Sequence, residues 1–423
     1  MNKRIYTNNY HYTNQNNYEN FLNNNSNHNN SNTNNSEHLF SMNYPDNLYS
    51  LNNPEQLNPI NYTNKDEKLN LMNYNPNNYP NNNYDLDNDI LIPESQENKY
   101  QVKTKKIKEE GIINYGNNCY LNSGLQILAS CNQLVKVLEK YMDKNGLIGI
   151  MNNAFVKILS KDLYDPLDLW GYFCHKNNEH LEAQCCSQNF IRKILKNLND
   201  ELIAIGDIHI INDELYKLVS QIEYQKYTNY INVNNKFPES EALKLFTGIN
   251  KYHSNGKCQY CRMQNEDFSF SYFLDQNIYL DDINEKSLFS KVLFENIGKM
   301  NCLTMNCKQC KQEINIEEEI KFIKLPEILI FTLERYNEII NNIEIIPDKM
   351  IDMNNYLDKS VYLTNTKYEL FAINIRFGLS RDNGHEICQV KRNGQWYEIN
   401  DTKIYKKTRD YNSNSYGLFY RRL

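Results

Sequence analysis

Cys119 stands where a stretch rich in glycine and asparagine, residues 111–118, runs into an apolar segment with helical character, residues 119–128. A thiol at the first turn of a helix lies at the positive end of the helix dipole, which favours the thiolate over the thiol. Because the thiolate is the nucleophilic form, this position suits covalent catalysis. A lone cysteine at such a place is more often a small buried residue, so its interpretation depends on what else the chain provides.

A candidate general base lies in the C-terminal part of the chain. His385 follows a glycine and is the only histidine after His253. A single histidine is usually a surface or core residue. Here, however, Asn393-Gly394 lies between two alternating runs and is a strong signal for a type I′ hairpin. The hairpin would place His385 beside side chains of the returning strand.

The register of that hairpin selects a partner for His385. Counting outward from the turn pairs His385 with Thr402. Since side chains alternate faces along a strand, Asn400 shares the face of His385 at its diagonal, whereas Asp401 points to the other face. An asparagine amide can fix the tautomer and orientation of an imidazole. We therefore expect Asn400 to orient His385, and a single bulge would give that place to Asp401 instead. Asp401 stays a catalytic candidate, because it can assist from behind the triad or polarise the oxyanion site.

Two cysteine pairs have the spacing of metal ligands. Cys258 and Cys261 form one CxxC pair, and Cys307 and Cys310 form the other, with 45 residues between the pairs. Each pair can place two thiolates on one Zn²⁺, and together they would complete a closed, structural, tetrahedral site. The spacing is longer than that of a compact zinc ribbon, and it fits two hairpin tips that meet at the ends of long strands. The alternative is four unrelated thiols.

The segment around Cys119 resembles the cysteine box of the ubiquitin-specific proteases, which are papain-like deubiquitinases. The matching positions are Gly111, Asn114, Gly116, Asn117, Cys119, Tyr120, Asn122, Ser123, Leu125 and Gln126. The resemblance implies that Cys119 is the nucleophile and that the side-chain amide of Asn114 helps to form the oxyanion hole, where a preorganised donor stabilises the tetrahedral intermediate. Without the box, Asn114 would be a turn residue.

The segment 384–401 resembles the histidine box of the same family, Gly-His-Tyr followed by Trp-Tyr-x-Phe-Asn/Asp-Asp. The resemblance implies that His385 is the base and that Asn400, four residues after Trp396, is the third member. Two residues depart from the family pattern. Glu386 stands where the family has Tyr, and Arg376 stands where it has His on the preceding strand.

A third box of the family, Gln-Gln-Asp-Ala-x-Glu-Phe-Leu, has a counterpart at the start of the amphipathic segment 184–198. By resemblance, the two acids of this box face the basic C-terminal tail of ubiquitin. Here Cys186 and Asn189 stand at the acid positions, and Gln184 aligns with the first glutamine. These three residues are therefore the candidate substrate-binding positions, and we expect their attraction for the basic tail to be weak.

The resemblance implies an α+β, papain-like cysteine protease fold with a helical thumb, a β-rich palm and zinc-tipped fingers. The catalytic domain would span residues 106–423, with the thumb at 111–200, fingers and palm at 236–335, and the palm with the histidine box at 336–423. Residues 1–105 are roughly one-third asparagine and contain no glycine or cysteine. Such a composition predicts a disordered arm.

Composition narrows the partners and the compartment. The formal net charge is −6, which gives no reason to expect nucleic acid as a partner, and no apolar run reaches the ~18 residues that a membrane span needs. The start of the chain does not resemble a signal peptide. We therefore expect a reducing compartment, the cytoplasm or the nucleus, in which the eleven cysteines would not form structural disulfides. The sequence does not set the oligomeric state.

The sequence as a whole predicts a thiol protease that hydrolyses isopeptide or peptide bonds at the C-terminal glycine of ubiquitin, with ubiquitin or ubiquitinated proteins as partners. The triad would be Cys119, His385 and Asn400, with a thioester intermediate and a structural zinc ion. The replaced acids favour an alternative, a catalytically weak or inactive scaffold that binds ubiquitin or a ubiquitin-like protein.

Overall fold

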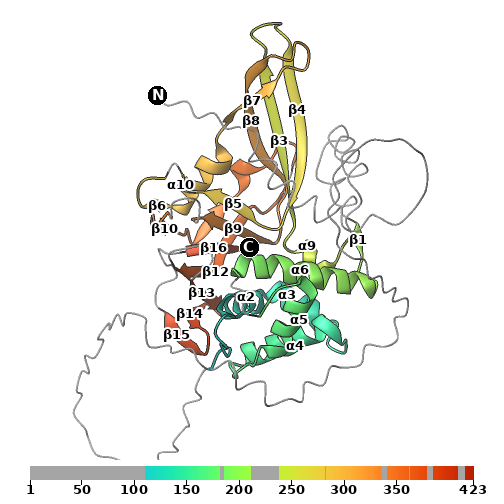
Figure 1. The fold of residues 1–423 in the computed structure, drawn as a ribbon, viewed down its shortest axis with the longest axis vertical. Helices are drawn as coiled ribbons and strands as arrows, with labels where there is room; N and C mark the ends of the chain where they lie inside the picture. The colour runs from blue at the N-terminus through green and yellow to red at the C-terminus, as the bar shows by residue number, and fades with distance from the viewer. Residues whose placement is uncertain are drawn as a thin grey trace, which may run out of the picture. The chain divides into compact units, whose positions relative to one another are not determined.

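Helices make up most of the N-terminal part of the folded chain, and strands make up most of its C-terminal part (Figure 1). The computed structural model describes residues 110–181, 185–210, 238–281, 283–335, 341–361, 363–378, 384–407 and 415–423. The asparagine-rich arm, residues 1–105, lies outside these ranges, and so does Gln184. The expected α+β architecture is confirmed.

The thumb consists of five helices: α2 (Cys119–Ala129), α3 (Asn132–Glu139), α4 (Gly146–Leu159), α5 (Leu167–Asn177) and α6 (Ser187–Ala204). Every residue of α2 is buried, since it contacts α3, α4 and α6 as well as strands β12, β13 and β14 of the palm. Gly124 allows α6 to approach, because a Cβ there would lie 2.6 Å from Cδ1 of Phe190.

The palm is an eight-stranded sheet with seven strands in the order β15-β14-β13-β12-β16-β9-β5, and β11 pairs with β12 off this path. Its strands are β5 (Gln276–Tyr279), β9 (Ile328–Glu334), β11 (Met350–Asp352), β12 (Lys367–Phe377), β13 (His385–Arg392), β14 (Gln395–Asn400), β15 (Lys403–Lys407) and β16 (Ser415–Arg422). All neighbours are antiparallel except the pair β5 and β9.

Side chains alternate between the two faces of the sheet along the palm strands, so the sheet contributes to two hydrophobic cores. On β14, Tyr397 and Ile399 belong to the core shared with the thumb, and Trp396 belongs to the core on the opposite face. Cys388 and Ile387 on β13 divide in the same way. One face of the sheet thus carries the thumb helices, and the other packs against the elements that lead to the fingers.

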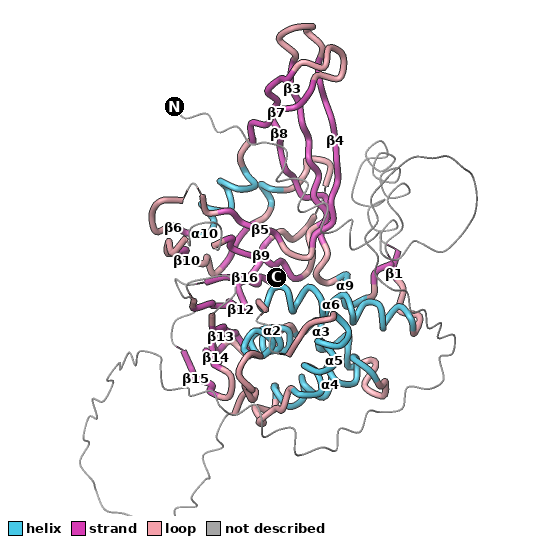
Figure 2. The backbone as a smooth tube through the Cα atoms, in the orientation of Figure 1, coloured by secondary structure: helices cyan, strands magenta, loops and turns pink. Residues whose placement is uncertain are grey.

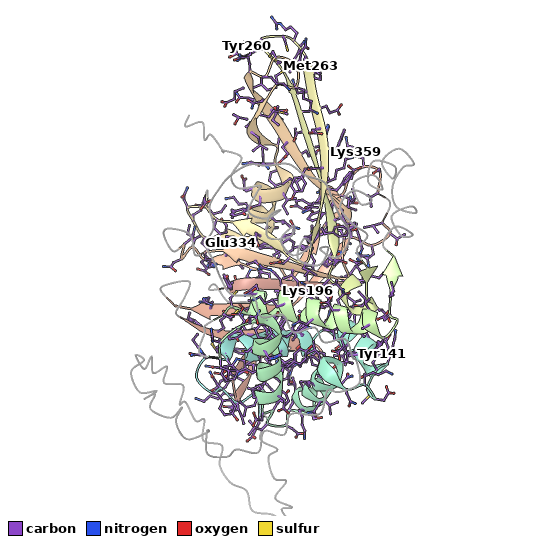
Figure 3. The ribbon with its side chains drawn as sticks, turned by 45° about the vertical axis from the view of Figure 1, so that its right-hand side comes forward. Tyr141, Lys196, Tyr260, Met263, Glu334 and Lys359 are labelled. Atoms are coloured by element: carbon purple, nitrogen blue, oxygen red, sulfur yellow. The ribbon has the colours of Figure 1, made fainter. Side chains whose placement is uncertain are left out.

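The fingers are a four-stranded antiparallel sheet in the order β4-β3-β8-β7 (Figure 2). The strands are β3 (Gly248–Lys257), β4 (Gln264–Phe273), β7 (Asn301–Asn306) and β8 (Glu313–Lys324). Tyr260 and Met263 lie at the far tip of this sheet (Figure 3), and Tyr260 is 60% exposed. Two hairpins, β3–β4 and β7–β8, therefore end at one place, as the spacing of the CxxC pairs predicts.

Short elements connect these parts: β1 (His209–Ile210), β2 (Pro238–Glu239), α9 (Glu241–Lys244), β6 (Ser287–Leu288), α10 (Phe289–Leu293), the π-helix η3 (Phe294–Gly298), β10 (Ile345–Ile346) and the 3-10 helix η4 (Asn354–Tyr356). No helix in the described part of the chain is long and apolar enough to cross a membrane.

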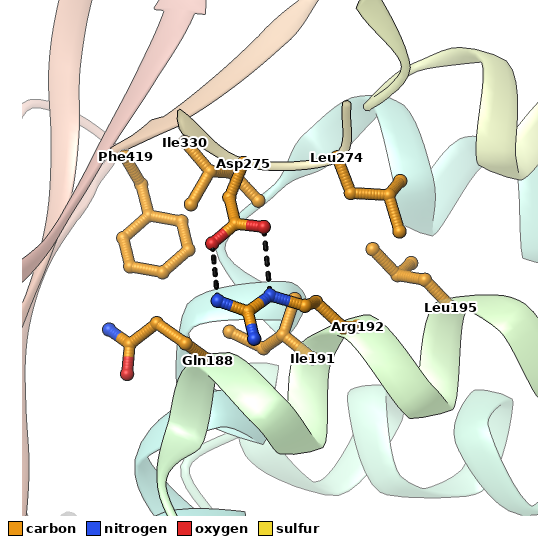
Figure 4. Close-up of a pocket in the computed structure, with 8 residues that line it drawn as sticks. All are labelled: Gln188, Ile191, Arg192, Leu195, Leu274, Asp275, Ile330 and Phe419. Atoms are coloured by element: carbon orange, nitrogen blue, oxygen red, sulfur yellow. Dashed lines mark hydrogen bonds and ion pairs between the residues drawn. The ribbon is translucent and has the colours of Figure 1, made fainter. Parts of the chain in front are cut away.

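An ion pair between Arg192 and Asp275 joins the thumb to the palm and the base of the fingers (Figure 4). Arg192 on α6 donates through Nε and Nη2 to the two carboxylate oxygens of Asp275, at 2.8 and 2.7 Å. Asp275 lies between β4 and β5 and also accepts from Thr332 Oγ1 at 2.8 Å. The bidentate geometry fixes α6 in direction as well as in distance.

Candidate active site

Cys119 is the first residue of α2 and is only 8% exposed. Burial raises the pKa of its thiol to about 12, the negative charges of Glu386 and Asp401 add to the rise, and hydrogen bonding from the backbone of Glu386 and Tyr120 opposes it. The thiolate expected from the helix dipole is therefore not favoured by the protein around Cys119 alone. A cationic partner is needed to stabilise it.

The hairpin β13–β14 has the expected register. Arg392 pairs with Gln395, and Cys388 pairs with Ile399. The turn residues Asn393 and Gly394 have φ values of 50° and 81°, as a type I′ turn requires.

His385 and Asn400 meet at the open end of this hairpin. Asn400 Oδ1 lies 2.9 Å from Nε2 of His385. Because an amide oxygen can only accept, Nε2 carries the proton in this bond and Nδ1 is left as the basic nitrogen. The backbone of Glu386, the next residue, lies close enough to the thiol of Cys119 to lower its pKa, and β13 packs against α2. The strand that begins at His385 thus meets the start of α2.

Asp401 bonds to the cysteine box and not to the imidazole. Its two carboxylate oxygens accept from Nδ2 of Asn114 and from Nδ2 of Asn122, both at 2.8 Å. Asp401 adopts a φ of 52°, which turns its side chain away from the course of β14. The backbone supports this contact, because Ile112 N donates to Asp401 O at 2.9 Å.

A glycine makes this approach possible. A Cβ on Gly111 would lie 2.0 Å from the carbonyl oxygen of Asp401. Any other residue at position 111 would push the segment 110–112 away from the segment 401–403 and would separate Asn114 from Asp401.

Asn114 is held at both ends of its amide. Its Oδ1 accepts from Gly116 N at 2.8 Å, and its Nδ2 donates to Asp401. One Nδ2 hydrogen is left to point elsewhere. Sequence reasoning missed the contribution of Asn118 and Asn122, whose side chains bond to each other at 3.0 Å and both reach the carbonyl of Ile113. Their i, i+4 spacing on the helix was the available signal.

The far end of α2 is also attached to the hairpin. Arg392 donates from Nε to Ser130 Oγ at 2.9 Å and from Nη2 to the carbonyl oxygen of Gln126 at 3.1 Å. A cation at the C-terminal end of a helix interacts favourably with the helix dipole. Both ends of α2 are therefore tied to β13 and β14, which fixes Cys119 relative to His385.

The substrate-binding residues predicted from the third box lie near the start of α6. Cys186 is the N-cap of α6 and gives no side-chain hydrogen bond to the helix. Asn189 donates from Nδ2 to the sulfur of Cys185 at 3.1 Å. Cys185 and Cys186 are both partly exposed. Gln184 lies outside the described residues, so the structure brings only Cys186 and Asn189 together.

The two departures from the histidine box pair with each other. Arg376 on β12 and Glu386 on β13 are cross-strand partners, and Arg376 Nη1 lies 2.6 Å from Glu386 Oε1. Their side chains are 4% and 1% exposed. Taken separately, each looked like a lost family residue. Taken together, they form a buried ion pair beside the candidate base.

The four-cysteine cluster lies at the fingertip. The Sγ atoms of Cys258, Cys261, Cys307 and Cys310 all lie within 4.8 Å of one another. Two contacts are closer: Cys258 to Cys310 at 3.5 Å and Cys261 to Cys307 at 3.6 Å. Four thiolates on one Zn²⁺ at about 2.3 Å would be separated by about 3.8 Å, so the group fits a tetrahedral ion.

The two CxxC turns of the cluster, which we call knuckles, have the same backbone geometry. Cys258 N donates to Met263 O and Cys307 N to Gln312 O, both at 2.8 Å. The fourth residue after each first cysteine, Arg262 or Lys311, has a positive φ, of 65° and 60°. The repeated design supports one shared ligand set rather than four unrelated thiols.

The chain is similar to known proteins. A family model described as ubiquitin carboxyl-terminal hydrolase matches residues 110–420. Ubiquitin carboxyl-terminal hydrolase 23 of Arabidopsis thaliana is 24% identical over 326 residues, 73% of this chain and 35% of that protein. Probable ubiquitin carboxyl-terminal hydrolase 4 of Schizosaccharomyces pombe is 23% identical over 351 residues, 74% of this chain and 58% of that protein.

This chain thus spans between a third and three-fifths of the length of those two curated relatives. Among solved structures, the yeast SAGA DUBm matches with a TM-score of 0.53 at 19% identity, covering 74% of this chain and 68% of that chain. This likeness shows the shared fold.

Proposed function

Because this chain belongs to the ubiquitin carboxyl-terminal hydrolase family, we propose that it hydrolyses the isopeptide or peptide bond after the C-terminal glycine of ubiquitin. The observation that carries the proposal is the meeting of three remote segments: the thiol of Cys119 against the backbone of Glu386, and His385 bonded to Asn400. Ubiquitin and ubiquitinated proteins are the proposed partners, in the cytoplasm or nucleus.

In the proposed mechanism, Nδ1 of His385 takes the proton of Cys119, and the resulting imidazolium stabilises the thiolate. The thiolate attacks the carbonyl carbon of the terminal glycine. His385 then gives its proton to the leaving amine as the carbon–nitrogen bond breaks, which leaves a thioester on Cys119. A water molecule, deprotonated by His385, attacks the thioester carbonyl and releases the ubiquitin carboxylate and the free thiol.

Asn400 and Asn114 have separate roles in this proposal. Asn400 Oδ1 accepts from Nε2–H of His385, which keeps Nδ1 directed at the nucleophile. Asn114 supplies its second amide hydrogen to the oxyanion of the tetrahedral intermediates. Asp401 and Gly116 hold that amide in place before the charge develops, so little reorganisation accompanies the reaction.

We also propose that the four fingertip thiols hold a structural zinc ion. Cys258, Cys261, Cys307 and Cys310 would use all four positions of a tetrahedral site, which leaves none for a substrate. The small core beneath them, which includes Ile314 and Ile316, has few apolar residues of its own. The ion would therefore stabilise the ends of the two hairpins.

The decisive experiment uses ubiquitin that carries a C-terminal propargylamide. The active chain should form a covalent adduct on Cys119, identified by peptide mass spectrometry, and Cys119→Ala should form none. Cys302→Ser is the matched control, because Cys302 is an exposed cysteine outside the site and its loss should leave the adduct unchanged. Binding of the probe without an adduct would support the scaffold alternative and reject the protease.

A further inference from the structure

Glu386 is a buried carboxylate with an unusual number of donors around it. Its Oε1 takes Nη1 of Arg376 at 2.6 Å. Its Oε2 takes the backbone N–H of Ser187 at 3.0 Å, Nδ2 of Asn374 at 3.2 Å and the hydroxyl of Ser187. These partners offset the cost of removing a carboxylate that is 1% exposed from water.

The carboxylate of Glu386 caps the start of α6, where the N-cap residue itself provides no side-chain cap. Ser187 is the first residue of α6, and the N-cap residue, Cys186, offers no side-chain hydrogen bond. The first N–H groups of a helix have no partner within it, and an acid there is favoured by the helix dipole. Glu386 therefore caps an 18-residue helix from a neighbouring strand.

The same carboxylate is connected to α2. The hydroxyl of Ser187 lies 2.8 Å from the carbonyl oxygen of Tyr120, the residue after Cys119. A hydroxyl has one proton, so this proton is shared between Tyr120 and Glu386. The backbone of Glu386 itself reaches the thiol of Cys119. Four elements, α2, α6, β12 and β13, thus meet at one charged group.

We propose that Glu386, held by Arg376, is a positioning residue that sets the geometry between His385 and Cys119. This inference rests on the proposed function. Glu386 directly follows His385, so the bonds that fix its side chain also fix the start of β13. Loss of the oxygen acceptor at this position, or its capture by an unpaired Arg376, would free the start of α6 from β13, and His385 would no longer be fixed relative to Cys119.

A double-mutant cycle on the intact chain tests this without ubiquitin. The measured quantity is the rate at which iodoacetamide alkylates Cys119 at pH 7, followed by peptide mass spectrometry. In the native chain, His385→Ala should slow this rate by about a hundredfold or more. In a Glu386→Gln background, the same His385→Ala change should slow it less than about threefold. Any direct effect of the lost charge on the thiol cancels in this comparison.

Two paired variants separate the ion pair from the helix cap. Glu386→Gln with Arg376→Gln removes both charges, leaves no buried ion alone, and keeps an amide oxygen at the start of α6. We call the slowing of Cys119 alkylation by His385→Ala the His385 effect. In this variant it should return to within about threefold of its size in the native chain. Glu386→Arg with Arg376→Glu keeps an ion pair but moves the acid away from α6, and the His385 effect should stay small.

A second buried ion pair provides the control. Lys324 and Glu239 are 7% and 2% exposed and 3.3 Å apart, between β8 and β2. Glu239→Gln should lower the melting temperature and leave the His385 effect at its native size. If Glu386→Gln does not fold, the variant without both charges and the charge-swapped variant still test the inference. Thermal unfolding shows whether each of them folds, and alkylation of Cys119 gives its His385 effect.

The inference is overturned if the His385 effect in Glu386→Gln is as large as in the native chain, or if the charge-swapped pair restores it. It is also overturned if His385→Ala has no effect in the native chain. Failure of the proposed function has a different signature, namely a normal His385 effect on alkylation without any adduct with ubiquitin propargylamide.

Discussion

The Cys119 site and the fingertip cluster both depend on cysteine, and they are assembled in opposite ways. At the fingertip, the sulfur pairs in contact are 46 and 52 positions apart, and each knuckle turns its own two thiols inward. At the Cys119 site, Asp401 bonds to Asn114 and Asn122 across 287 and 279 positions. One centre is encoded by two short motifs, and the other exists only when the whole domain has folded.

The surroundings of the thiols differ as well. The pKa of the Cys119 thiol is raised by burial, and in the proposed mechanism the thiol depends on His385 for its reactivity. The fingertip thiols could together hold a metal ion, and they lie over a small core whose buried aliphatic residues are Ile314 and Ile316. Changes at the two centres should therefore be separable, and substitutions at each centre test that separation, from the largest expected effect to the smallest.

Removal of one fingertip ligand should have the largest thermodynamic effect. Cys307→Ser should abolish zinc binding, a loss of about 10–16 kcal/mol of metal-binding free energy at neutral pH. Elemental analysis of the purified chain gives the zinc content, and hydrogen exchange reports the loosening of β3, β4, β7 and β8. Cys302→Ser should retain one zinc ion per chain. A well-folded native chain without zinc would contradict the prediction.

His385→Ala should have the next largest effect, a fall in kcat of about 10²- to 10⁴-fold. It should also change the pH dependence of Cys119 alkylation. The pKa of the thiol is raised to about 12 by burial, so without the imidazolium the thiolate fraction should rise about tenfold per pH unit from pH 7 toward pH 12. Alkylation that stays fast at pH 7 in this variant would show that His385 does not activate Cys119.

Asp401→Asn should have a smaller effect than His385→Ala, and it should lower both the stability of the fold and the rate of catalysis. It removes the charge from two hydrogen bonds, each worth about 1.5–3 kcal/mol when an ion is involved. We expect a lower free energy of unfolding in urea and a lower kcat, because Asn114 loses its support. Asn400→Ala should lower kcat with little change in stability. A reversed pattern, with the larger kcat loss at Asp401 and none at Asn400, would make Asp401 the third member of the triad.

Acids at the start of α6 should have the smallest effect. Cys186→Asp with Asn189→Glu should lower KM for a ubiquitin substrate. The gain in binding free energy should be about 1 kcal/mol or less, because these partly exposed positions are screened by solvent. The measurement is KM at low and high salt, with the gain lost at high salt. An unchanged KM at low salt would mean that these positions do not face the basic tail.

The sequence was sufficient where the signal is local. The Asn393-Gly394 turn fixed the register of its hairpin, and this register placed Asn400 beside His385. The spacing of the CxxC pairs indicated two hairpin tips, and the fingers sheet has them. In both cases the signal lies in a few neighbouring residues, although the pairing of β3 with β8 is what brings the two hairpin tips together.

The sequence was insufficient where two distant segments define each other. Asp401 serves Asn114 and Asn122 because the segment 110–112 lies against 401–403, and no local pattern contains that contact. Arg376 and Glu386 looked like two independent losses, although adjacent strands make them partners. The helix dipole suggested a thiolate at Cys119, but the complete burial of α2 outweighs it.

The position of β16 in the palm has a consequence for how the protein is made. This strand lies between β12 and β9, and both of these precede it in the chain. During synthesis, β9 and β12 therefore emerge without the neighbour that joins them, and each presents an unpaired edge until residues 415–422 have left the ribosome. A nascent chain that stalls shortly before that point would hold two half-sheets, with Cys119, His385 and Asn400 already synthesised and not yet fixed in one domain.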